Sequence, residues 1–247
     1  MSTHTPDLTN LSFTSPPSTH SFTALLFDMD GTIIDSTPAI IKHWTAIGEA
    51  INVDPATILA TSHGRRSIDV LALLKPELAT WEYVCEAEGR VPREWGGDAV
   101  EIAGARGLLK ELGERGVPWA IVTSGTLPLV SGWLGVMGLA RPGVLVTAEQ
   151  VRVGKPDPAC YRLGAERLLG GEVEGKGVLV LEDAPAGVRA GKAAGFMVVA
   201  LATTHEVARL REAGADWIVR DLESVRVVEW DGGKGVARVE IRDALVD

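Results

Sequence analysis

Two acidic residues, Asp28 and Asp30, directly follow a short apolar run and precede Gly31-Thr32. Two carboxylates one residue apart at the end of a strand can direct an oxygen atom and nearby backbone amides at the same small anion. The alternative is a solvated turn, because Asp and Gly are common turn residues. The Asp-x-Asp-Gly pattern alone leaves both interpretations open.

A second acidic pair, Glu182-Asp183, also follows an apolar run. Carboxylates gathered at one edge of a sheet repel one another unless a cation lies among them, and ligand sets made only of oxygen suit Mg²⁺. The two acidic pairs together therefore predict a magnesium site.

Donors for an anion occur at two further places in the sequence. Ser124-Gly125 follows a third apolar run, and Lys155 precedes a predicted helix. A hydroxyl, backbone amides and an ammonium group can hold phosphate oxygens while an acid attacks phosphorus or binds metal. These residue types make up the inventory of a phosphoryl-transfer site.

The elements that must bring these residues together are short buried strands. Apolar runs that end abruptly in polar residues occur at 24–27, 119–122, 178–181 and 197–201. Such runs are typical of a parallel sheet covered on both faces by helices. One helix is predicted from Asp157-Pro158 to Gly170, and another over Ala184 to Ala194, closed by Gly195. The sequence thus predicts an α/β fold with a Rossmann-like parallel sheet, whose ligands lie at the carboxyl ends of the strands.

Residues 37–103 change to helical periodicity without a convincing buried strand, which predicts an inserted all-helical cap. The α/β core then comprises residues 21–36 and 104–247. Near the end of the chain, two alternating runs flank Asp231–Gly235 and predict a C-terminal β-hairpin. Residues 1–20 are rich in Ser, Thr and Pro and hold no Lys or Arg, so we expect a disordered tail. This tail has neither a secretory nor a mitochondrial pattern, and the expected location is the cytoplasm.

Composition excludes several classes of protein. Hydrophobic residues make up 46% and charged residues 23% of the 247, which indicates a folded globular chain rather than a disordered one. No apolar stretch is long enough to span a bilayer, so we expect no membrane partner. A net charge of −9 argues against general binding of nucleic acid. Cys85 and Cys160 form no Cys-x-x-Cys pair that would indicate zinc or redox chemistry. A monomer is favoured, and the oligomeric state stays open.

Four motifs in order at the predicted strand ends resemble those of the haloacid dehalogenase superfamily. They are 28–32, 122–125, 154–158 and 181–187. The insert lies where that superfamily carries its small helical cap. Segments 62–69, 147–151 and 190–195 are similar, more narrowly, to the fungal glycerol-phosphate and 2-deoxyglucose-6-phosphate phosphatases.

The resemblance implies roles for the motif residues. Asp28 would be the nucleophile that forms an aspartyl-phosphate, and Asp30 would act as general acid and base while its backbone carbonyl binds Mg²⁺. Asp183 would be a direct Mg²⁺ ligand, and Glu182 would hold a water molecule bound to the metal. The implied metal set is therefore Asp28, Asp30, Asp183 and Glu182.

The same resemblance implies that Ser124, Gly125 and Lys155 bind the transferring oxygens, with Lys155 also paired to Asp28. In the cap, His63, Arg65 and Arg66 are candidates for substrate contact, because an arginine can grip phosphate or hydroxyl oxygens. Glu88 resembles a residue of a cap loop in the same phosphatases. Each of these cap residues has a plainer alternative as a surface charge.

We predict a Mg²⁺-dependent hydrolase of phosphoric monoesters that acts on a small phosphorylated polyol or sugar, such as glycerol 3-phosphate or 2-deoxyglucose 6-phosphate. Asp30 and the acidic pair argue against dehalogenation, since dehalogenases of the superfamily lack the second Asp and the metal. The alternatives are a phosphosugar mutase with the same motifs and a catalytically silent binding module. The complete set of charged motif residues argues against the silent module. His205 and Glu206 are expected at the loop surface.

Overall fold

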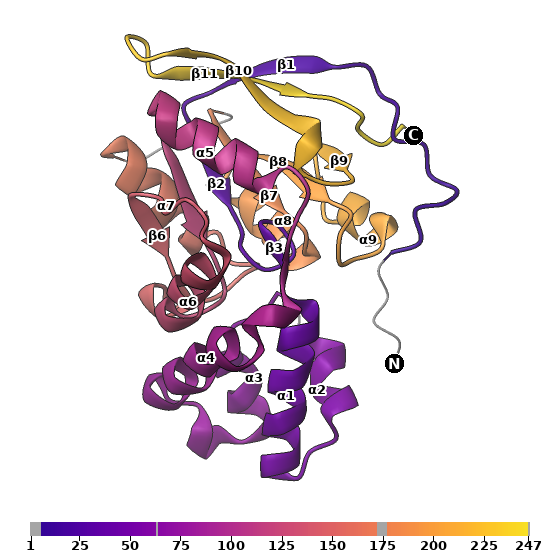
Figure 1. Cartoon of the computed structure of the whole chain (residues 1–247), viewed down its shortest axis with the longest axis vertical. Helices are drawn as coiled ribbons and strands as arrows, with labels where there is room; N and C mark the ends of the chain where they lie inside the picture. The colour runs from indigo at the N-terminus through magenta and orange to yellow at the C-terminus, as the bar shows by residue number, and fades with distance from the viewer. Residues whose placement is uncertain (1–5, 63, 172–176, 247) are drawn as a thin grey trace.

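A six-stranded parallel sheet forms the centre of the molecule in this computed structural model, which describes residues 6–62, 64–171 and 177–246. The strand order is β6-β5-β2-β7-β8-β9, with every neighbouring pair parallel (Figure 1). The strands are β2 (Ala24–Phe27), β5 (Trp119–Val122), β6 (Val144–Val146), β7 (Val178–Glu182), β8 (Met197–Leu201) and β9 (Trp217–Val219). The four predicted strands are confirmed as β2, β5, β7 and β8. Sequence reasoning missed β6 and β9, which are three residues long and lie at the two edges of the sheet.

Helices cover both faces of the sheet, and the central strands are therefore buried on both sides. Leu25 and Phe27 of β2 belong to a core shared with α5 (Ala105–Arg115) and α6 (Leu127–Met137). Ala24 and Leu26 face the other core, with α7 (Ala159–Leu169), α8 (Pro185–Ala193) and α9 (Val207–Glu212). The predicted helix boundaries near Gly170 and Gly195 are confirmed, since both glycines have positive φ directly after or just beyond their helices.

The inserted segment forms a helical unit of α1–α4 below the carboxyl edge of the sheet (Figure 1). Its helices are α1 (Thr37–Ile51), α2 (Pro55–Ser62), α3 (Ser67–Leu74) and α4 (Trp81–Trp95). They share a small hydrophobic core of their own, centred on Trp44, Ile58 and Leu71. The expectation of an all-helical insert needs one correction: β4 (Val100–Glu101) pairs antiparallel with β3 (Ile34–Asp35) where the chain enters and leaves the unit. Strands as short as these give no period of two that could be read from the sequence.

A second, three-stranded sheet has the order β1-β11-β10 and confirms the predicted hairpin. The hairpin strands are β10 (Val225–Asp231) and β11 (Val236–Ile241), and β1 (Ser18–Phe22) pairs antiparallel with β11 (Figure 1). Residues 6–20 of the predicted disordered tail are therefore ordered against the core, which corrects that expectation; residues 1–5 lie outside the described residues. The physical reason is that β11 offers an open edge for backbone pairing and that Phe13 is buried in a core.

The two structural units also meet through a buried carboxyl group. Glu88 of α4 accepts hydrogen bonds from the Ser67 hydroxyl at 2.5 Å and from the backbone amide of Thr126, just before α6, at 2.7 Å. Burial raises the pKa of Glu88 to about 7, and the charge of Asp30 adds to this rise. Within the described residues, no helix combines the length and the apolar character needed to cross a bilayer.

Truncation of Phe13 tests whether the N-terminal segment is part of the folded domain. We expect Phe13→Ala to lower the free energy of unfolding by about 3 kcal/mol, because a buried aromatic ring is removed. The Arg220 guanidinium, 4.5 Å from the centre of that ring, also loses its contact. Denaturant unfolding measures the loss. The control Thr14→Ala, at an exposed site, is expected to change stability by less than about 0.5 kcal/mol. Equal stability of both variants would mean that the segment is detached in solution.

Glu88→Gln tests the buried carboxyl group through pH. Because the folded pKa of about 7 lies above the ordinary value of 4.5, the stabilising contribution is complete below pH 4.5 and is lost as the pH rises through 7. Wild-type protein should lose up to about 3 kcal/mol of stability from this residue between about pH 5 and pH 8, and the glutamine variant should lose none of it. Urea unfolding at both pH values measures the difference. If the difference in unfolding free energy between wild type and variant did not vary with pH, the raised pKa of Glu88 would be contradicted.

Candidate active site

A cavity of about 590 Å³ lies between the carboxyl edge of the sheet and the helical unit. The core lines it with the predicted motif residues at the ends of β2, β5 and β7, including Asp28, Ser124 and Asp183. The helical unit lines it mainly with apolar side chains, such as Ile40 and Trp44 of α1. The acidic motif residues therefore lie on the core wall, and much of the apolar surface lies on the helical wall.

Lys155 joins two of the acidic motifs that line this cavity. Its Nζ donates to Asp28 Oδ1 at 2.5 Å and to Glu182 Oε1 at 2.6 Å, and also to the backbone carbonyl of Val122 at 3.2 Å. Lys155, Asp28 and Glu182 are all at least nine-tenths buried. The predicted pairing of Lys155 with Asp28 is confirmed, and it ties three segments that are far apart in the sequence.

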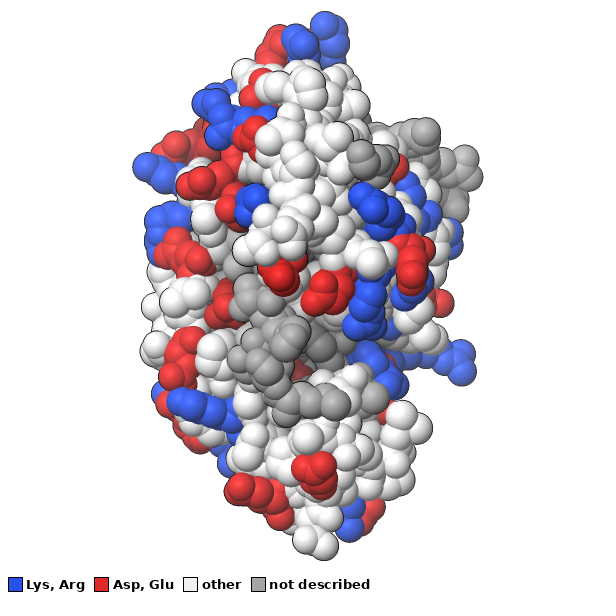
Figure 2. All heavy atoms as spheres, turned by 90° about the vertical axis from the view of Figure 1, so that its right-hand side faces the viewer, with Lys and Arg blue, Asp and Glu red and all other residues white. Residues whose placement is uncertain are grey.

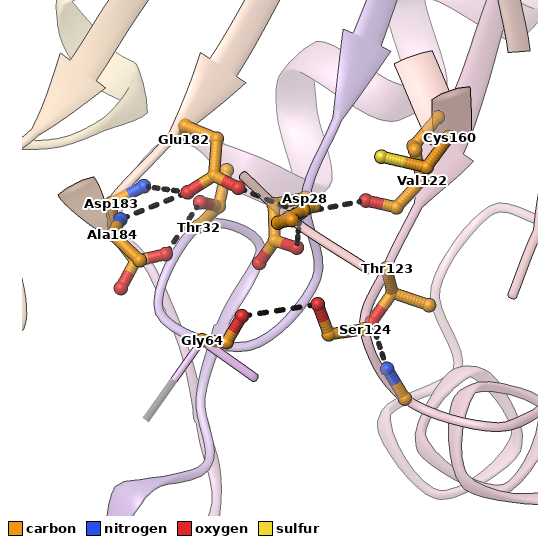
Figure 3. A network of polar contacts seen from close by, with 12 residues as sticks. Asp28, Thr32, Gly64, Val122, Thr123, Ser124, Cys160, Glu182, Asp183 and Ala184 are labelled. Carbon is orange, nitrogen blue, oxygen red and sulfur yellow. Dashed lines mark hydrogen bonds and ion pairs between the residues drawn. The ribbon is translucent and has the colours of Figure 1, made fainter. Parts of the chain in front are cut away.

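Glu182 has both carboxylate oxygens engaged by the protein. Oε1 accepts from Lys155 and from the Tyr161 hydroxyl at 2.9 Å, while Oε2 accepts from the backbone amides of Asp183 and Ala184, each at 2.9 Å (Figure 3). The turn into α8 approaches this carboxylate so closely that a Cβ atom on Gly187 would lie 1.5 Å from Oε1. Its partners make Glu182 a support for Lys155 and for the α8 turn.

Asp183 lies beside Asp28 with its carboxylate held by hydroxyl groups. Oδ1 accepts from Thr32 at 3.2 Å, and Oδ2 accepts a short hydrogen bond from Thr204. Gly31 has a φ of +90°, and a Cβ atom there would lie 2.2 Å from Asp183 Oδ2. Only glycine satisfies both the backbone conformation and this close approach, which explains the Gly that follows Asp30 in the motif.

Asp30 points to the entrance of the helical unit. Its Oδ1 accepts a hydrogen bond of 2.5 Å from the Ser36 hydroxyl, directly before α1, and Asp30 also lines the cavity. This position places a second carboxyl group near Asp28, as the Asp-x-Asp spacing requires.

The acidic cluster fits a divalent metal ion. Asp28, Glu182 and Asp183 each offer a carboxylate oxygen within 4.8 Å of the others, and all three residues are buried. Burial raises the pKa of Asp28 well above its usual value, and the charges of Glu182 and Asp183 raise it further against the opposing effect of Lys155. Burial alone would lower the pKa of Lys155, but the carboxylates of Asp28 and Glu182 outweigh it and raise this pKa well above normal. Lys155 pairs with Asp28 and Glu182, and an oxygen-binding cation among the three carboxylates would offset further negative charge.

The end of β5 supplies hydroxyl groups on the opposite side of Asp28 (Figure 3). The Ser124 hydroxyl donates to the backbone carbonyl of Gly64 at 3.1 Å, and the Gly125 amide donates to Thr123 Oγ1 at 2.9 Å. Both predicted anion donors therefore line the cavity, and both make hydrogen bonds within the protein in this structure.

Among the cap candidates, Arg66 lies away from the cavity in this structure. Its side chain is buried, and its guanidinium bonds to Asp69 and to three backbone carbonyls of the core instead of lining the cavity. Arg65 and Glu88 do line the cavity. His63 lies outside the described residues. Sequence spacing alone could not tell which of two adjacent arginines faces the cavity.

Several residues of the cavity were missed by sequence reasoning. His43 of α1 is buried, and its Nε2 has no hydrogen-bond partner among the described residues. Burial and the charge of Arg90 lower the pKa of His43 to about 4, so the ring is neutral at pH 7. Thr204 and His205 also line the cavity, so the expected position of His205 at the loop surface is corrected. The side chains of Thr204 and His205 are hydrogen-bonded to each other at 2.9 Å. The helical stretch around His43 is apolar and gave no sign of a site residue. Thr203-Thr204 could have been found, because these polar residues follow the buried strand β8 at the same edge of the sheet.

Comparison with known proteins identifies relatives over most of the chain. A family model for haloacid dehalogenase-like hydrolases matches residues 22–195. Glycerol-1-phosphate phosphohydrolase 1 of Saccharomyces cerevisiae is 39% identical over 88% of this chain and 90% of its own length. Hexitol phosphatase A of Escherichia coli is 37% identical over 84% of this chain and 95% of its own. For 2-deoxyglucose-6-phosphate phosphatase 1 of S. cerevisiae the identity is 36%, with coverages of 83% and 89%.

Solved structures support the same fold. A hydrolase from Pseudomonas syringae superposes with a TM-score of 0.67 at 24% identity, covering 81% of this chain and 94% of that one. The family model, the extent of the relatives and the convergence of the four motifs at one sheet edge agree. The chain belongs to the haloacid dehalogenase-like hydrolases.

Proposed function

We propose that this protein is a Mg²⁺-dependent phosphatase that hydrolyses a small phosphorylated polyol or sugar through an aspartyl-phosphate. The observation that carries the proposal is the buried contact of Lys155 with Asp28 beside an acidic cluster made only of oxygen ligands. A carboxylate held by a cation and exposed to a cavity is a competent nucleophile toward phosphorus.

In the first half of the reaction, a carboxylate oxygen of Asp28 attacks phosphorus and the bond from phosphorus to the substrate oxygen breaks. Asp30 gives its proton to the leaving alkoxide, so the alcohol departs neutral. Ser124 would release its bond to Gly64 and donate to a phosphoryl oxygen, while the Lys155 ammonium offsets the negative charge that gathers around Asp28.

In the second half, the ionised Asp30 takes a proton from a water molecule that attacks the phosphorus of the aspartyl-phosphate. The acyl-phosphate bond breaks, inorganic phosphate leaves, and Asp28 and protonated Asp30 are restored. The hydrogen bond from Ser36 orients Asp30 for both proton transfers.

The residues proposed to hold Mg²⁺ are Asp28, Asp183 and the backbone carbonyl of Asp30, with Glu182 placed behind them through its own partners. When bound, the ion would neutralise negative charge on the phosphoryl oxygens and allow two anions to meet. Thr32 and Thr204 keep the Asp183 carboxylate in position for this task.

The proposed substrate class rests on the relatives and on the walls of the cavity. The relatives named above are described as phosphatases of glycerol phosphate, hexitol and 2-deoxyglucose 6-phosphate. His43, Glu88 and Arg65 line the cavity from the helical unit, and the Arg65 guanidinium can bind substrate hydroxyl groups. On the face shown in Figure 2, acidic and basic side chains are interspersed, which suits a small metabolite better than a nucleic acid.

Asp28→Asn tests the nucleophile. We expect phosphate release from glycerol 3-phosphate and 2-deoxyglucose 6-phosphate to fall at least about 10⁴-fold, because an amide oxygen does not form the acyl-phosphate. The matched control Asp35→Asn, which also lines the cavity, should retain most activity. Activity of Asp28→Asn near the wild-type level would reject the mechanism. Transfer of phosphate between sugar positions without its release would instead identify a mutase.

Removal of Mg²⁺ tests the metal site with and without turnover. A chelator should abolish hydrolysis and added Mg²⁺ should restore it. Mg²⁺ at about 100 times its Kd should also raise Tm by about 5–10 °C, because binding to the folded state is worth about 2.7 kcal/mol. Asp183→Asn should lose this shift, and the surface control Glu114→Gln should keep it. A thermal shift that persists in Asp183→Asn would place the ion elsewhere.

A further inference from the structure

Among the described residues, polar contacts at three places join the helical unit to the core, and each reaches a segment beside a candidate catalytic residue. The Ser124 hydroxyl donates to a backbone carbonyl of the helical unit, and Glu88 accepts from the amide of Thr126. The third contact is made by Arg66, which lies between α2 and α3, and it reaches the loop that leads to Lys155.

The Arg66 guanidinium uses its full set of N–H groups within the protein. Nε and Nη2 donate to the two carboxylate oxygens of Asp69 at 2.7 and 2.8 Å. Nη1 donates to the carbonyls of Ala148 and Val151 at 3.3 and 2.8 Å, and Nη2 also donates to that of Arg152 at 3.2 Å. A guanidinium has five N–H groups, and these five bonds engage all of them. Arg66 therefore has no donor left for a substrate.

The loop held by Arg66 delivers Lys155 to the site. Residues 151–154 belong to no helix or strand and connect η3 (Ala148–Gln150) to Lys155. The loop passes directly over the guanidinium, since a Cβ atom on Gly154 would lie 2.7 Å from Arg66 Nε. Gly154 precedes Lys155, so the guanidinium contacts the backbone one peptide away from the residue that pairs with Asp28.

Charge explains why an arginine suits this position. Asp69 neutralises the guanidinium, and the remaining donors point at backbone carbonyls of the loop and of the residues just before it. Hydrogen bonds from an ionised donor are roughly twice as strong as neutral ones, and the planar fork fixes several acceptors in one geometry. A lysine ammonium has only three N–H donors, and they do not lie in one plane as those of a guanidinium do.

We propose that Arg66 is a positioning residue, through which the closed helical unit fixes the loop that places Lys155 against Asp28. The inference rests on the proposed role of Lys155 in phosphoryl transfer. The position of the helical unit and the Lys155 contact are then coupled, because Arg66 of that unit is bonded to the loop of Lys155.

Arg66→Ala separates positioning from substrate binding. We expect kcat to fall about 10- to 100-fold with both para-nitrophenyl phosphate and glycerol 3-phosphate, because a displacement near ~1 Å at the reacting groups has this effect. KM should stay within about twofold of the wild-type value for both. Arg66→Lys should remain impaired, and guanidinium ion at tens of millimolar should restore part of the activity of Arg66→Ala. The control Val153→Ala, whose side chain is exposed on the same loop, should be unchanged.

Gly154→Ala provides a second test that leaves Arg66 in place and so covers the case in which Arg66→Ala does not fold. The new methyl group should displace the Arg66 guanidinium and lower kcat. In the Arg66→Ala background, Gly154→Ala should cause no further loss of kcat, because the guanidinium with which the methyl group collides is absent. Full activity of Gly154→Ala would overturn the proposal. So would a rise in KM confined to glycerol 3-phosphate in Arg66→Ala, which would make Arg66 a substrate ligand. Absence of hydrolysis by the wild-type enzyme would refute the proposed function instead.

Discussion

A buried ammonium group shared by two carboxylates is the contact on which the arrangement of this protein depends. Lys155 touches Asp28 at the end of β2 and Glu182 at the end of β7, two strands that are neighbours in the sheet. Removing any of these charges from water is costly, and the attraction among them offsets that cost only when the geometry is fixed. The loop before α7 must therefore lie across the ends of both strands, and this requirement places the cavity where it is.

Close packing of backbone around the charged groups follows from the same requirement. Gly31 and Gly187 lie so near to the carboxylates of Asp183 and Glu182 that no side chain fits, and backbone amides can then reach Glu182. A carboxylate held by amides and an ammonium has little freedom to move. The core wall of the cavity is accordingly a rigid set of charges, prepared before substrate enters.

Sequence patterns predicted the parts of the fold whose signal is long or chemically distinctive. The central strands and the meeting of Asp28 with Glu182 followed from apolar runs that end in polar motifs, and the hairpin followed from two alternating runs. The contact of Lys155 with Asp28 was implied by the resemblance of its motif. Strands β6 and β9 are too short for such a run, and the pairing of β1 with β11 depends on an edge at the far end of the chain that a Ser- and Thr-rich segment does not reveal. The direction of the Arg66 side chain could not be predicted from the sequence either, because its hydrogen-bond acceptors are backbone carbonyls of the other unit.

The two walls of the cavity divide the chemistry between them. The core wall carries the charges for attack on phosphorus, whereas the helical wall includes the apolar side chains of Ile40 and Trp44. Substitutions on the helical wall can alter which alcohol is accepted where they fall in the cluster around Trp44, which lies within the helical unit. Ala39 and Val91 of the same unit pack in the core cluster that includes β2. The polar contacts between the units couple them further: a change that tilts α3 moves Arg66 and, through it, the loop of Lys155. Selection of the substrate can thus vary freely only where it leaves those contacts in place.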